Sequence, residues 1–79
     1  MNYAKLINEA SFLFNTEKQN NSGQTEAIFY ILEQLDSMEK KLRKKLEKVF
    51  ESGERNDLID KIRVIVAQKK KGMKRLRGS

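Results

Sequence analysis

One long amphipathic segment dominates this chain of 79 residues. Apolar side chains recur in it at steps of three and four, which places them on one face of a helix. At 100° per residue they span an arc of roughly 120°, the width of a stripe that faces a core. The members are Ile28, Ile31, Leu32, Leu35, Met38, Leu42, Leu46, Val49 and Phe50. The spacing predicts a helix over residues 25–52, capped by Thr25 or Ser22, ended by Gly53 and about 40 Å long.

Shorter amphipathic segments flank it. Residues 3–17 place one apolar face on a helix, which consists of Tyr3, Leu6, Ile7, Ala10, Leu13 and Phe14. Residues 57–70 also place one apolar face on a helix, which Asn56 or Asp57 would cap. This face consists of Leu58, Ile59, Ile62, Ile65 and Val66. Turn-forming residues separate the segments at 20–23 and 52–56. The second turn is short, a length that joins antiparallel neighbours.

These patterns predict an all-α fold of three helices. We expect a long central helix in an antiparallel helical hairpin, a short N-terminal helix and a basic C-terminal extension. The helical domain covers residues 1–68, and a basic tail that frays near Gly72 covers residues 69–79. A hydrophobic core of this size gives a net stability of only about 3–5 kcal/mol when no disulfide or metal adds to it. The length of the central helix therefore predicts a homodimer.

Several functions are disfavoured by residue types that the chain lacks. It has no His and no Cys, which removes the usual zinc and haem ligands and the thiolate nucleophile. It also has no Gly-rich phosphate loop. We therefore expect no enzyme activity, no cofactor and no metal site. No apolar run is long enough for a transmembrane span, and no secretory signal is recognisable, so a cytoplasmic location is expected.

Positive charge is concentrated at one end of the chain. The first 60 residues hold nine Lys and Arg against eleven Asp and Glu, whereas the last 19 hold eight bases and no acid. Such a cluster is suited to a polyanion, because phosphate contacts release counterions. We predict a small non-catalytic accessory or regulatory protein that binds nucleic acid mainly through phosphate. The candidate residues are Lys61, Arg63, Lys69, Lys70, Lys71, Lys74, Arg75 and Arg77.

Other interpretations of the charge remain open. On another interpretation, the bases keep the protein soluble or complement the helix dipole. A second basic run at 40–48 lies opposite the apolar stripe and is most simply a solvated face. A helix-turn-helix could use Arg63, Gln68 and Lys69 as base readers, but the central helix is too long for that motif. No aromatic residue follows Phe50, which disfavours stacking on single strands.

The aromatic residues suggest a different function. Phe12, Phe29 and Tyr30 fall off the apolar stripes and, with Ala27, form a candidate second patch, whereas Phe14 and Phe50 are expected in the core. The simplest interpretation is that this patch contacts the N-terminal helix or a dimer mate. The alternative is a binding surface for a different protein, as in an adaptor, inhibitor or assembly factor. In that case the basic tail would serve solubility or contact with a membrane surface. In size, charge and helicity alone, such a basic bundle is similar to small bacteriocin immunity proteins.

Overall fold

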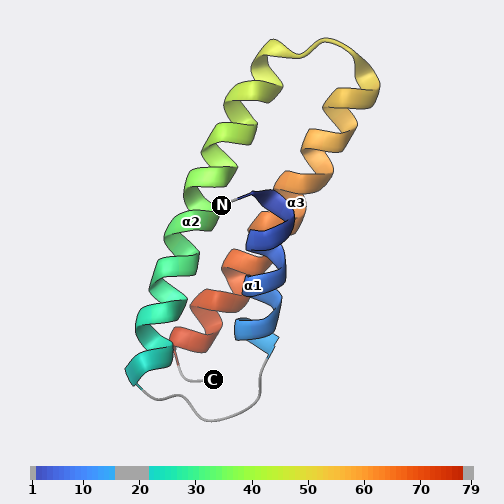
Figure 1. Ribbon diagram of the computed structural model, residues 1–79. Helices are drawn as coiled ribbons and strands as arrows, with labels where there is room; N and C mark the ends of the chain where they lie inside the picture. The colour runs from blue at the N-terminus through green and yellow to red at the C-terminus, as the bar shows by residue number, and fades with distance from the viewer. Residues whose placement is uncertain (1, 16–21, 78–79) are drawn as a thin grey trace.

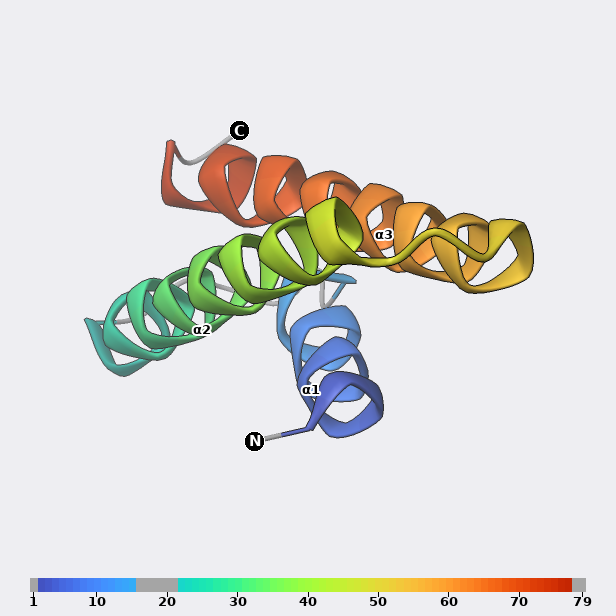
Figure 2. The same ribbon diagram turned by 90° about the horizontal axis from the view of Figure 1, so that it is seen from above.

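Three α-helices form the part of the chain that a computed structural model describes, residues 2–15 and 22–77 (Figure 1). Helix α1 spans Tyr3–Asn15, α2 spans Ser22–Lys48 and α3 spans Ser52–Leu76. The long helices α2 and α3 lie side by side and run antiparallel, and α1 packs against both (Figures 1 and 2). The predicted all-α class with three helices is confirmed, and the arrangement is compatible with the expected hairpin.

The hydrophobic core lies where the three helices meet. Its buried members come from the predicted apolar faces and are Leu6, Ala10, Phe14, Ile28, Ile31, Leu35 and Ile65. Burial of each large side chain among them contributes about 1.5–3 kcal/mol. Because α1 covers only the half of the hairpin that holds the start of α2 and the end of α3, the core is concentrated in that half (Figure 1).

The connection between α2 and α3 is shorter than the sequence predicted. Helix α2 ends at Lys48 rather than at residue 52, and α3 begins at Ser52 rather than at residue 57. The carboxylate of Glu51 is the cause, since it accepts hydrogen bonds from the backbone N–H groups of Gly53 and Glu54, at 3.2 and 2.7 Å. A cap of this kind satisfies the free donors at a helix start. The predicted roles of Gly53, Asn56 and Asp57 at helix ends were therefore wrong.

A single arginine side chain donates hydrogen bonds to carbonyl oxygens at the end of α2. The Nη1 atom of Arg55 donates to the carbonyl oxygens of Leu46 and Val49, both at 2.9 Å. The link between the helices leaves Phe50 with 90% of its surface exposed. The prediction that Phe50 belongs to the core was wrong, because Phe50 follows the last turn of α2 and no longer shares its apolar face.

The predicted boundary between helical domain and basic tail also needs correction. Helix α3 continues through Gly72 to Leu76, so residues 69–76 are helical. Gly72 is buried, and a Cβ atom there would lie 2.7 Å from both Phe14 Cζ and Leu32 Cδ2. The missing side chain thus lets α3 approach α1 and α2 closely, and this contact offsets the low helix propensity of glycine.

The remaining boundaries differ less. Helix α2 begins at Ser22, three residues before the predicted start, and takes in two residues of the predicted first turn. Helix α1 ends at Asn15 in the described part of the chain. The predicted end of the first helix at residues 16–17, the turn residues 20–21 and the last two residues of the tail lie outside the described residues.

Candidate nucleic-acid interface

Four exposed cations form a line along the outer surface of α3. They are Arg63, Lys70, Lys74 and Arg77, and we call them the α3 basic stripe. Because α3 is continuous over these positions, 100° per residue places all four within an arc of roughly 60°. At 1.5 Å per residue the stripe extends about 21 Å. A basic segment predicted to fray is therefore an ordered row of charges.

The stripe faces away from the rest of the protein. The side chains of Leu58, Ile62 and Ile65 are buried, and they lie on the opposite side of α3. Helix α3 runs along one edge of the molecule, so that its outer surface is not covered by α1 or α2 (Figure 2). No acidic residue occurs in the chain after Asp60. The stripe itself therefore carries only positive charge.

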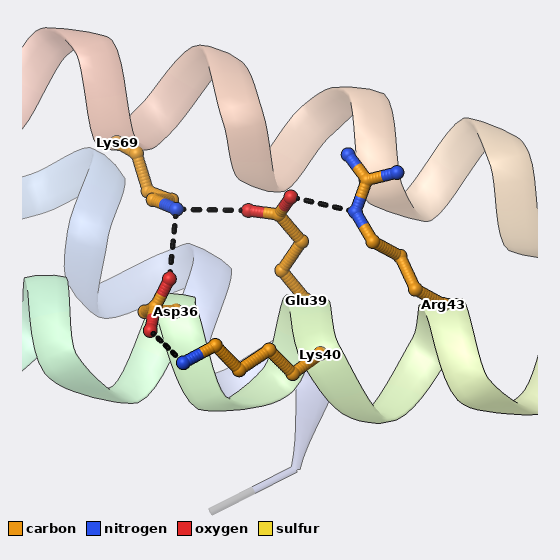
Figure 3. Close-up of polar contacts among 5 residues, drawn as sticks. All are labelled: Asp36, Glu39, Lys40, Arg43 and Lys69. Carbon is orange, nitrogen blue, oxygen red and sulfur yellow. Dashed lines mark hydrogen bonds and ion pairs between the residues drawn. The ribbon is translucent and has the colours of Figure 1, made fainter.

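Lys69 is adjacent to the stripe in sequence but points in another direction. Its Nζ atom lies 3.0 Å from Asp36 Oδ1 and 2.9 Å from Glu39 Oε1, across the contact between α3 and α2 (Figure 3). The two carboxylates also pair with Lys40 and Arg43, at 3.1 and 2.8 Å. Lys69 therefore fastens α3 to α2, although no acid follows it in the sequence.

These contacts shift the pKa values of the three groups. The hydrogen bond from Lys69 is the main reason that the pKa of Asp36 and that of Glu39 are lowered. The bonds to Glu39 and Asp36 in turn raise the pKa of Lys69 against an opposing effect of desolvation. All three groups are therefore held in their charged forms.

Of the other predicted bases, one is exposed near the stripe and two are half-buried. Lys71 is exposed on the flank of the stripe, and Arg75 is half-buried. Lys61 is half-buried too, pairs with Asp57 at 3.3 Å, and lies 5.4 Å from the centre of the Tyr3 ring. The geometry thus brings together four of the eight predicted residues, with Lys71 beside them.

The residues that a helix-turn-helix would need lie elsewhere. Gln68, 8% exposed, donates from Nε2 to Ser11 Oγ at 3.1 Å, which joins α3 to α1. Lys69 is held by the two carboxylates of α2. Of the three predicted base readers, only Arg63 therefore faces solvent, so base recognition by such a motif has little support.

The predicted aromatic patch is divided over two faces. Phe12, 80% exposed, and Tyr30 line a groove of about 400 Å³ between α1 and α2, together with Leu13, Ala27 and others. Phe29 lies instead beside Met73 in a groove between α2 and α3. The two positions follow each other in sequence, and a helix turns by about 100° between them.

The described residues contain no candidate metal site and no helix suited to span a membrane. Within residues 2–15 and 22–77, no group of three or more acidic, Cys or His side chains could hold a metal ion. None of the helices in the described part combines the length and apolar character needed to cross a bilayer. No protein-family model matches the chain, and no curated protein or solved structure matches it at a significant level.

Proposed function

We propose that this is a non-catalytic accessory or regulatory protein that binds nucleic acid through phosphate contacts of the α3 basic stripe. The observation that carries the proposal is the alignment of Arg63, Lys70, Lys74 and Arg77 on one exposed face of α3, in a part of the chain with no acid after Asp60. A cytoplasmic location, expected from the sequence, belongs to the same proposal.

Like charges repel one another along such a row. Lys70 and Lys74 are four residues apart on the same face, where like charges destabilise a helix by about 0.2–0.5 kcal/mol. A polyanion converts this cost into binding energy, because each phosphate contact releases condensed counterions. Binding of this kind does not depend on base sequence and positions the protein on its ligand.

Two triple variants that each lose three positive charges test the proposal. The stripe variant is R63Q/K70Q/R77Q, and the control variant K41Q/K44Q/K48Q removes three exposed lysines of α2. Fluorescence anisotropy would measure affinity for mixed-sequence DNA and RNA as a function of salt. Wild-type protein and the control should bind at about 50 mM salt, and the stripe variant should lose at least about tenfold in affinity with a log–log salt slope that is less steep by about 3.

Two outcomes would contradict the proposal. Wild-type protein that binds no nucleic acid at low salt would exclude it. Equal losses in both variants would show that net charge alone, and not the stripe, determines binding. Circular dichroism of each variant would establish that the helices are intact.

The groove between α1 and α2 favours a second candidate, a protein-interaction module. Phe12 and Tyr30 are exposed beside Leu13 and Ala27, which suits the apolar face of a partner helix. A stoichiometric protein partner that resists nuclease and high salt would support this function. Tyr30→Ala should release such a partner, whereas Phe50→Ala, a change of an exposed aromatic residue far from the groove, should not.

Self-association remains part of the proposal. The end of α2 lies beyond the reach of α1 (Figure 1). Leu42 and Leu46 are half-buried there, and Phe50, four residues after Leu46, is exposed. We propose this end as the contact of a homodimer. Light scattering of the wild-type protein should give twice the mass of one chain, and Phe50→Ser should shift it toward the mass of one chain.

A further inference from the structure

We infer that the ligand of the α3 basic stripe is double-stranded DNA, with α3 lying in the major groove. This inference rests on the proposed function and adds to it the form of the nucleic acid. Its first support is shape. A helix with its side chains is about 10–12 Å across, and the major groove of B-form DNA is about 12 Å wide. Because α3 forms an edge of the molecule, its outer surface is convex and free to enter such a groove (Figure 2).

The residue between the cations supports the same geometry. Ala67 is exposed and borders the stripe one turn after Arg63 and just before Lys70. The longest gap between cations is therefore next to the smallest side chain of that face. The backbone of α3 can approach the floor of a groove there, while the flanking cations reach outward to the phosphates on either side.

The second support is rigidity. The close contact of Gly72 with Phe14 and the ion pairs of Lys69 with α2 hold the stripe straight on both sides of Lys70. A straight row of charges about 21 Å long matches a duplex, which is stiff over about 50 nm and carries one charge per about 1.7 Å of axis. A flexible single strand carries its charges more sparsely and loses entropy when it is straightened.

Other polyanions fit the same surface less well. Proteins that bind single strands stack the bases on aromatic side chains, and α3 contains no aromatic residue. A helix bound to an anionic membrane buries an apolar face in the lipid. The large apolar residues Leu58, Ile62 and Ile65 of α3 are buried inside the protein. Val64 and Met73 are exposed, but they lie on opposite sides of the helix and form no common apolar face. Double-stranded RNA has a major groove too deep and narrow for side chains to read.

Five probes test this inference in anisotropy and co-sedimentation experiments. The first is a DNA duplex of about 20 base pairs, which at about 3.4 Å per pair is longer than the stripe. The second is one strand of that duplex, and the third is an RNA duplex of the same sequence. The fourth is the DNA duplex with bulky substituents on pyrimidine C5, and the fifth is a vesicle of phosphatidylcholine and phosphatidylserine. Substituents on C5 project into the major groove. For each phosphate contact, log affinity falls against log salt concentration with a slope of about 0.9 for duplex DNA and about 0.7 for a single strand. If four contacts form and the two affinities are equal at about 1 M salt, the duplex should bind about tenfold tighter than the single strand at about 50 mM salt.

The results separate the inference from the proposed function. Preference for the plain DNA duplex, weakened by the C5 substituents and lost in R63Q/K70Q/R77Q, would support the inference. Equal or tighter binding to the single strand or to RNA, or indifference to the C5 substituents, would overturn the inference and leave nucleic-acid binding intact. Binding only to vesicles, or to none of the probes, would overturn both.

Discussion

The ammonium group of Lys69 lies 2.9 Å from the carboxylate of Glu39, which joins the basic end of the chain to the middle of α2. Lys69 opens the run of three lysines, yet its side chain belongs to the helix interface and not to the exposed stripe. The same contact includes Asp36 at 3.0 Å. One cation of the basic segment therefore serves the fold, and its neighbours on the outer face are positioned by it.

The pairing of Lys69 predicts a pH-dependent stability. Glu39 and Asp36 have lowered pKa values in the fold, so the stability they contribute is present above their unfolded-state pKa near 4 and is lost as the pH falls through their lower folded pKa. Glu39→Gln should lower the melting temperature at neutral pH, roughly 4–8 °C for each 1 kcal/mol lost. The difference from wild type should shrink below about pH 4. Thermal denaturation by circular dichroism measures both, and a difference independent of pH would contradict the role of this charge.

The close approach at Gly72 predicts an unusual sign for a glycine substitution. Replacement of an exposed helical glycine by alanine stabilises by up to about 1 kcal/mol. Gly72→Ala should instead destabilise by about 1–3 kcal/mol, because its Cβ would displace the ring of Phe14 and the side chain of Leu32. Gly53→Ala is the matched control, since its Cβ would meet only the exposed end of the Glu51 side chain, at 3.1 Å, and no core residue. Urea denaturation compares the two, and a stabilised Gly72→Ala would refute the packing argument.

Two phenylalanines should respond very differently to truncation. Phe14 is 5% exposed in the core, whereas Phe50 is 90% exposed in the link between α2 and α3. Phe14→Ala should destabilise by about 3–5 kcal/mol, which approaches the full stability of a domain of this size. Phe50→Ala should change the unfolding free energy by less than about 0.5 kcal/mol at concentrations where the protein is monomeric. Similar losses in both variants would show that Phe50 is covered in solution.

A negative charge beside the stripe should weaken the proposed binding. Ala67→Glu places a carboxylate next to Arg63 and Lys70, where it competes with phosphate for both cations. Ala4→Glu makes the same change of charge on the exposed surface of α1. Affinity for a DNA duplex at about 50 mM salt should fall at least about fivefold in the first variant and stay within about twofold in the second. Equal effects would place the binding surface elsewhere.

Much of the fold could be predicted from the sequence because apolar periodicity survives without tertiary information. The spacing from Ile28 to Leu46 and from Leu58 to Ile65 specifies which faces of α2 and α3 are buried. The helix ends were harder to predict, because they depend on single side chains. Glu51 caps α3 although Ser, Thr, Asp and Asn are the favoured residues at that position. Gly72 continues a helix because of residues more than thirty positions away in sequence.

The candidate site could be predicted only in part, for a similar reason. The sequence shows where the bases are concentrated, and helical periodicity could have selected Arg63, Lys70, Lys74 and Arg77 had the helix been expected to continue. The pairing of Lys69 with Asp36 and Glu39 depends on the register between α2 and α3. That register is fixed by core packing and leaves no local pattern in the sequence. The separation of Phe29 from Tyr30, by contrast, follows from the turn of about 100° between consecutive helical residues.

The straight, acid-free end of α3 has a consequence for salt. Between Lys70 and Arg77 the folded protein holds like charges closer together than an extended chain does, and dissolved ions screen that repulsion. Added sodium chloride should therefore stabilise the last two turns of the free protein, visible as slower hydrogen exchange of their amides. The same ions compete with the phosphate contacts that we propose. A single arrangement of charges thus gives folding and binding opposite responses to ionic strength.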